Sequence, residues 1–139
     1  MKIVVYSEGG NPDAWLAAIG QHIPGAQAWA WAPGAPQADY ALVWRPPQQL
    51  LDGQGAGLKD IFNMGAGVDA LFQLQLPAGV PVVRLEDAGM AVQMAEYVSH
   101  AVIDHFRGLN HYRNQQLVGE WKLQPLRSRQ DFPVGTMGP

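Results

Sequence analysis

The sequence contains no cysteine, and this absence removes several kinds of chemistry at once. Without thiols there is no disulfide, no thiolate nucleophile and no thiolate metal site. Met1 and Lys2 lead directly into a strand-like segment and not into a long apolar one, so we expect no secretory signal. These features together predict a cytoplasmic protein.

Long apolar runs and charge of one sign are also lacking. No apolar stretch approaches the roughly 18 residues of a membrane-spanning helix. The net charge is −3 and the basic residues are scattered, which leaves no electrostatic footprint for nucleic acid or an anionic membrane. We therefore expect neither partner. The apolar fraction of 47% and the length of 139 residues instead favour one globular domain with an extension.

Residues 1–89 alternate between strand-like and helix-like segments. Strands are predicted at Lys2–Ser7, Ala26–Trp31, Tyr40–Trp44, Leu58–Met64 and Val80–Leu85. A helix is predicted to start with Asn11 as N-cap, Pro12 at its first position and Asp13 in its first turn. Shorter helices are predicted from Pro47 to Leu51 and over "VDALFQL", Val68 to Leu74. Strands separated by helices predict a parallel five-stranded sheet covered on both faces, which is the flavodoxin-like doubly wound α/β fold.

The pattern changes after Leu85, and residues 90–131 are predicted to form helices and a linker. A long amphipathic helix is expected from Met90 to Gly108 and a shorter one from Tyr112 to Glu120. The apolar stripe of the long helix consists of Ala91, Met94, Ala95, Val98, Val102 and Phe106. Because an exposed apolar stripe seeks another surface, we expect a homodimer through the 90–108 helix.

A glycine-containing turn is the first candidate for chemistry. Gly65, Ala66 and Gly67 follow one predicted strand and precede a predicted helix, so their amide groups suit a small anion such as a carboxylate. The alternative is a tight turn that needs glycine only for its dihedral angles. Trp44 and Arg45 end the neighbouring strand and are expected beside this turn. Arg45 either pairs with a carboxylate or is a solvated surface cation.

The four histidines are poorly placed for catalysis. Glu96, His100 and Asp104 stand four residues apart on the long helix, where they form a metal site, a base dyad or, as is more common, a solvated helix face. Met94 on the same helix is interpreted as packing. We assign neither a catalytic residue nor a metal site from the pattern.

Four ordered blocks of sequence resemble the N-terminal half of one enzyme family. The blocks "ADYALVWRPP", "LKDIFNMGAGVDAL", "VPVVRLEDAGMAVQMAEYV" and "YRNQQLVGEW" are similar in order and spacing to the D-isomer-specific 2-hydroxyacid dehydrogenases. The resemblance implies a flavodoxin-like substrate domain, crossing segments and an inserted Rossmann domain that binds NADPH or NADH. It also implies hydride transfer to the keto carbon of a small 2-oxo acid, glyoxylate or hydroxypyruvate.

The resemblance also implies roles for individual residues. The backbone amides of Met64, Gly65, Ala66 and Gly67 would hold the substrate carboxylate. Trp44 and Arg45 would form the adjoining pocket wall. Met94 would come near the nicotinamide from the start of the long helix.

The segment 132–139 is expected to be the start of the cofactor domain. Phe132–Met137 is predicted to be its first strand, and Gly138 would be the first glycine of its cofactor-binding turn. The family's catalytic arginine, glutamate and histidine have no matching positions in residues 1–139. We therefore expect the chain alone to bind no cofactor and to be catalytically inactive. The alternative is a free-standing flavodoxin-like module that binds a small carboxylate or a protein partner without catalysis.

Overall fold

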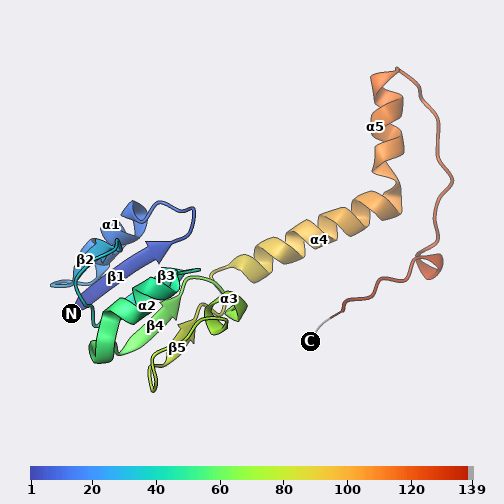
Figure 1. The fold of residues 1–139 in the computed structure, drawn as a ribbon. Helices are drawn as coiled ribbons and strands as arrows, with labels where there is room; N and C mark the ends of the chain where they lie inside the picture. Colours follow the sequence, from blue (N-terminus) through green and yellow to red (C-terminus); the bar gives the residue numbers. More distant parts are fainter. Residues whose placement is uncertain (138–139) are drawn as a thin grey trace. The chain divides into compact units, whose positions relative to one another are not determined.

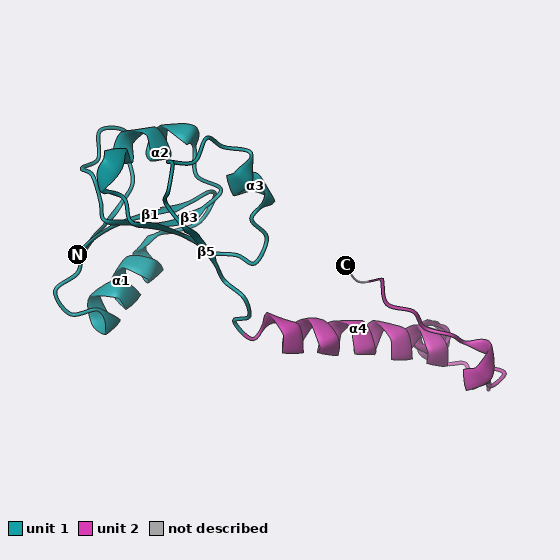
Figure 2. Ribbon diagram, turned by 90° about the horizontal axis from the view of Figure 1, so that it is seen from below, with its two compact units in different colours: residues 1–88 teal, residues 89–139 magenta. Residues whose placement is uncertain are grey.

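The computed structural model describes residues 1–137, which fall into two compact units (Figures 1 and 2). The first unit is Met1–Ala88, and the second begins at Gly89, one residue before the predicted change at residue 90. Gly138, the predicted cofactor-binding glycine, lies outside the described residues.

The first unit is built on a parallel sheet of five strands (Figure 1). The strands are β1 Lys2–Ser7, β2 Gln27–Ala30, β3 Tyr40–Trp44, β4 Asp60–Asn63 and β5 Val82–Arg84. Their order is β2-β1-β3-β4-β5, and every neighbouring pair is parallel. This is the strand order of the flavodoxin-like doubly wound fold, so the predicted fold class is confirmed.

Helices cover both faces of the sheet. Figure 2 shows α1 (Asp13–His22) on one face and α2 (Gln48–Gln54) with α3 (Asp69–Phe72) on the other. Helix α1 begins one residue later than predicted, with Pro12 as its N-cap. Asn11 still caps the first turn, because its side-chain oxygen accepts the Asp13 amide at 2.9 Å.

The core lies on both sides of the sheet because successive strand side chains point to opposite faces. In β1, Val4 packs into the cluster beneath α2 and α3. Its neighbours Ile3 and Val5 instead contact Ile19 of α1. Burial on both faces explains the nearly continuous apolar sequence of this strand.

The second unit contains α4 (Met90–Arg107) and α5 (Leu109–Leu117). Gly108 ends α4 in the left-handed region (φ 62°), as predicted, and donates its amide back to the carbonyl of His105. Helix α5 then begins at once, three residues before the predicted start. Within residues 1–137, no helix is both long and apolar enough to cross a membrane.

The strand predicted at Phe132–Met137 is wrong. These residues have no regular secondary structure and follow a 3-10 turn at Arg129–Asp131. A strand needs a neighbour to satisfy its backbone groups, and no described segment pairs with this one. The Phe132 ring instead packs against the rings of His105 and Phe106, at centroid distances of 5.6 and 5.1 Å.

Candidate functional site

The carboxyl ends of β1, β3 and β4 meet at one edge of the first unit and border a pocket of about 620 Å³. In a doubly wound sheet this edge is the usual place for a ligand. The side chains and backbone that line the pocket include Glu8, Trp44, Arg45, Asn63, Gly67 and Asp69. The structure therefore places the Trp44–Arg45 segment and the glycine turn side by side.

Asn63, the last residue of β4, holds the glycine turn in place through its side chain. Its side chain is buried (5% exposed), and its Nδ2 donates to the carbonyl oxygens of Gly65 and Gly67 at 2.7 and 2.9 Å. A trans peptide group directs its N–H away from its C=O. The Ala66 amide, which shares a peptide group with the Gly65 carbonyl, therefore points away from the Asn63 side chain. Sequence analysis missed Asn63, although a polar residue ending a buried strand was a usable signal.

The turn leaves three amide donors without a protein partner. Met64 donates its N–H to the carbonyl of Val43 at 2.9 Å, so this amide belongs to the sheet ladder. Within the described part of the chain, no acceptor receives the N–H groups of Gly65, Ala66 or Gly67. Backbone donors of this kind normally find an acceptor, and here a ligand or water has to supply it.

The glycine at position 65 is required by a close approach to Trp44. A Cβ on Gly65 would contact the six-membered ring of Trp44, with Cε3 at only 3.1 Å. Neither Gly65 nor Gly67 has a positive φ. The interpretation that these glycines serve only unusual dihedral angles is therefore wrong.

The Arg45 side chain is held at the pocket by two contacts. Its Nη1 lies 3.6 Å from Oε2 of Glu8, and its guanidinium carbon lies 5.6 Å from the Trp44 ring centroid. Arg45 also has a positive φ of 45°, which is uncommon for a residue with a side chain. Glu8 is fixed beside it because its amide donates to the Trp44 carbonyl at 3.0 Å. Sequence analysis missed Glu8, which directly follows β1 at the same edge.

The helix that follows the turn is shorter than the predicted helix, whose N-terminus was expected to attract an anion. Helix α3 spans four residues, Asp69–Phe72, and no side chain caps it. One helical turn has little dipole, so the predicted contribution of a helix N-terminus does not apply. Within the turn, the attraction for an anion therefore comes from the backbone amides and not from a helix dipole.

The predicted features of the long helix form no comparable site. Among residues 1–137 no group of three histidine or acidic side chains could hold a metal ion. Asp104 forms an ion pair with Arg113 of α5, in which Oδ1 and Nη2 lie 2.6 Å apart. Met94 is 53% exposed on α4.

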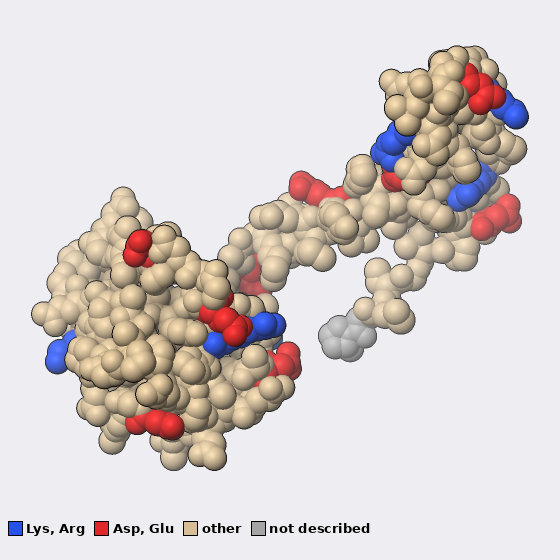
Figure 3. Space-filling model, turned by 45° about the horizontal axis from the view of Figure 1, so that its top comes forward, with Lys and Arg blue, Asp and Glu red and all other residues tan. Residues whose placement is uncertain are grey.

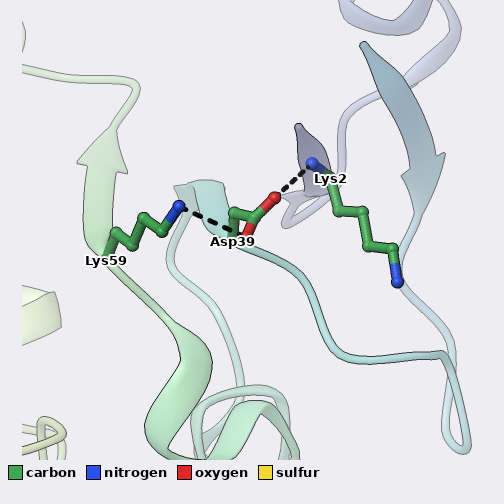
Figure 4. Close-up of polar contacts among 3 residues, drawn as sticks. All are labelled: Lys2, Asp39 and Lys59. Atoms are coloured by element: carbon green, nitrogen blue, oxygen red, sulfur yellow. Dashed lines mark hydrogen bonds and ion pairs between the residues drawn. The ribbon is translucent and has the colours of Figure 1, made fainter.

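A charge cluster lies at the opposite, amino-terminal ends of the strands (Figure 4). The amide of Lys2 donates to Oδ2 of Asp39 at 2.7 Å, and Nζ of Lys59 lies 3.6 Å from Oδ1. The hydrogen bond from the Lys2 amide lowers the pKa of the Asp39 carboxyl, and the charges of Lys59 and the N-terminus lower it further against the opposing effect of desolvation. This cluster joins β1, β3 and β4 and is separate from the pocket.

On the face drawn in Figure 3, acidic and basic side chains are interspersed on the first unit rather than collected into one field. The pocket follows the same pattern. Arg45 stands beside Glu8, and Asp69 lies on another side of the lining.

No protein-family model matches the chain. It is 43% identical over 145 residues to the glyoxylate/hydroxypyruvate reductase A of Serratia proteamaculans, a match that covers 99% of this chain and 46% of the relative. The chain thus spans about half the length of the curated relatives it matches.

Solved structures of 2-hydroxyacid dehydrogenases also match nearly the whole of this chain. A D-isomer-specific 2-hydroxyacid dehydrogenase from Xanthobacter autotrophicus, in complex with NADPH and MES, is 31% identical with a TM-score of 0.75, over 93% of this chain and 44% of that one. An NADPH-dependent glyoxylate/hydroxypyruvate reductase from Sinorhizobium meliloti, in complex with NADP and sulfate, is 26% identical with a TM-score of 0.74, over 94% and 42%. Over nearly its whole length, the chain is therefore homologous to slightly less than half of D-isomer-specific 2-hydroxyacid dehydrogenases of the glyoxylate/hydroxypyruvate reductase A type.

Proposed function

We propose that this chain is the substrate-binding part of an NAD(P)H-dependent 2-hydroxyacid dehydrogenase that reduces glyoxylate or hydroxypyruvate. In this role the amides of Gly65, Ala66 and Gly67 hold the carboxylate of a small 2-oxo acid. The observation that carries the proposal is the set of three amide groups that have no acceptor among residues 1–137, at the edge where β3 and β4 end.

The turn suits a carboxylate for a simple reason. A carboxylate has two oxygens and no donor, so it complements a short run of N–H groups. Asn63 holds two carbonyls of the turn, which leaves the donors rather than the acceptors available to a ligand. Trp44 packs against Gly65 and forms a wall, and Arg45 adds a positive charge at the rim.

Most of the cofactor-binding groups and the proton-transfer groups are proposed to belong to sequence other than residues 1–139. NADPH or NADH would supply a hydride to the keto carbon of the bound acid. Met94 is proposed to lie near the nicotinamide, and Gly138 to be the first glycine of the cofactor-binding turn. The polypeptide of residues 1–139 is accordingly proposed to bind a 2-oxo acid without reducing it.

A calorimetric titration of the 139-residue polypeptide with glycolate, the hydroxy acid formed from glyoxylate, tests the proposal. We expect saturable binding that is lost in Gly65→Ala and retained in Gly67→Ala. Absence of saturable binding to the unmodified chain would contradict the carboxylate site. In a parallel assay with glyoxylate and NADPH, protein-dependent oxidation would contradict only the proposed inactivity of the isolated chain.

We also propose that the chain forms a homodimer through α4. None of the residues of this helix is buried within the chain, and two members of its apolar stripe, Met94 and Val98, are 53% and 47% exposed. Apolar area of this extent on one helix face is typical of an interface.

A further inference from the structure

The charges around the pocket suggest how it selects among small acids. Among the described residues that line it, Arg45 is the basic side chain and Glu8 and Asp69 are the acidic ones. Arg45 is already partnered by Glu8 at 3.6 Å. The lining therefore carries a formal charge of −1, in a pocket proposed to bind an anion.

Glu8 and the proposed carboxylate site belong to different strand ends, since Glu8 follows β1 and the turn follows β4, whereas Asp69 lies against the turn, with its Oδ2 3.8 Å from the position of a Cβ on Gly67. The proposed carboxylate donors are neutral backbone amides, which require no positive side chain to bind one carboxylate. A second carboxylate on the same ligand would lie away from the turn, and Glu8 is the acidic side chain that lines the pocket on its β1 side. Glu8 would repel a carboxylate placed there, and the guanidinium of Arg45 that would compensate is already paired with Glu8.

We propose that Glu8 is a specificity-determining residue that rejects 2-oxo and 2-hydroxy acids carrying a second carboxylate. This inference rests on the carboxylate site of the proposed function. Glu8 repels the second carboxylate of such a ligand and also pairs with Arg45, which could otherwise bind that carboxylate. Acids with one carboxylate, whose keto or hydroxyl carbon carries a hydrogen or a hydroxymethyl group instead, are accepted. Selectivity of this kind is achieved by making the wrong ligand unfavourable rather than by adding contacts to the right one.

The position of Glu8 is built into the fold. Its amide donates to the Trp44 carbonyl at 3.0 Å, which extends the β1–β3 pairing one residue past Ser7 and Trp44. The side chain of Glu8 therefore starts next to the end of β3, where Arg45 follows Trp44. Both side chains remain partly exposed, at 57% for Glu8 and 59% for Arg45, so the effect has to be modest and sensitive to salt.

The test compares two ligands of nearly equal shape, glycerate and tartronate. Tartronate carries a second carboxylate where glycerate has a hydroxymethyl group. Their affinities for the 139-residue polypeptide are measured by calorimetry at low and high salt. We expect the unmodified chain to prefer glycerate, and Glu8→Gln to reduce this preference by about threefold at low salt, the size typical of a partly exposed charge pair.

Asp60→Asn is the matched control. It removes the same charge at the start of β4, at the other end of the strand from Asn63, and should leave the preference unchanged. High salt should bring the glycerate-to-tartronate affinity ratio of Glu8→Gln closer to that of the unmodified chain. A purely structural role of Glu8 would not predict this dependence on salt.

The possible results separate the two proposals. If glycerate binds but Glu8→Gln leaves the ratio of affinities unchanged, the specificity role of Glu8 is wrong and the carboxylate site stands. If Asp60→Asn changes the ratio as much as Glu8→Gln, the effect is one of net charge and the specificity role is again wrong. If neither ligand binds, the carboxylate site fails and the inference fails with it.

Discussion

Gly65 lies so close to Trp44 that a single added methyl group would enter the space of the indole ring. The two residues come from neighbouring strand ends, and their contact sets the distance between the turn and the pocket wall. Gly67, two residues further along, is different, because its Cβ would meet only Asp69 Oδ2 at an ordinary 3.8 Å. The two glycines therefore form an internal comparison.

Gly65→Ala is expected to destabilise the fold and displace the turn. Overpacking of this kind typically costs about 1–3 kcal/mol in the free energy of unfolding. Gly67→Ala should change the same quantity by less than about 1 kcal/mol, since the backbone there is compatible with alanine. Urea unfolding followed by circular dichroism measures both. If both variants lost the same free energy of unfolding, the proposed role of the contact between Gly65 and Trp44 would be wrong.

Asn63→Ala is expected to lower the free energy of unfolding by about 1–3 kcal/mol, because it leaves two carbonyls of the turn without their donor. Asn114→Ala, on an exposed position of α5, is the control and should stay within about 0.5 kcal/mol. Glycolate binding should weaken in Asn63→Ala at temperatures where the variant is still folded. Unchanged stability and binding would show that Asn63 does not organise the turn.

The lowered pKa of the Asp39 carboxyl predicts that the stability of the fold depends on pH. Its folded-state pKa is lowered, so its stabilising contribution is complete above the ordinary value of 3.8 and is lost as the pH falls through the lower folded value. Asp39→Asn should therefore cost stability at neutral pH and little at a pH well below 3.8. Lys59→Gln should have the smaller effect, because the Lys2 amide is the main cause of the shift. An acid unfolding curve that is unchanged in Asp39→Asn would contradict this assignment.

The proposed dimer predicts a response to charge on one face of α4. Val98→Glu places a carboxylate in the apolar stripe and should shift the chain toward monomer in sedimentation experiments. Gln93→Glu adds the same charge on the opposite side of the helix, at 100° per residue, and should leave the association state unchanged. A chain that is monomeric before any substitution would contradict the dimer itself.

The sheet was predictable because its strands are buried on both faces and their apolar residues are nearly continuous. Lys2–Ser7 and Tyr40–Trp44 were predicted with the bounds that the structure shows. Phe132–Met137 has similar apolar character but no neighbouring strand, and it is not a strand. Pairing is a property of the fold that a local pattern does not contain.

The site was predictable in outline, since a glycine turn after one strand and Trp44–Arg45 after its neighbour have to meet at one edge of a parallel sheet. The position of Asn63 at the end of a buried strand was a usable signal, but its bonds and the partner of Glu8 depend on side-chain geometry that the pattern does not contain. Asn63 bonds to carbonyls two and four residues ahead, and Glu8 pairs with Arg45 across strands that are far apart in sequence.

The most direct test of the account follows the turn amides themselves during a glycolate titration of ¹⁵N-labelled chain by nuclear magnetic resonance. The account predicts that the amide signals of Gly65, Ala66 and Gly67 shift together and saturate, while that of Met64, which is bonded to Val43, moves much less. If these three signals stay in place while glycolate binds elsewhere, or if no signal moves at all, the proposed carboxylate site does not exist.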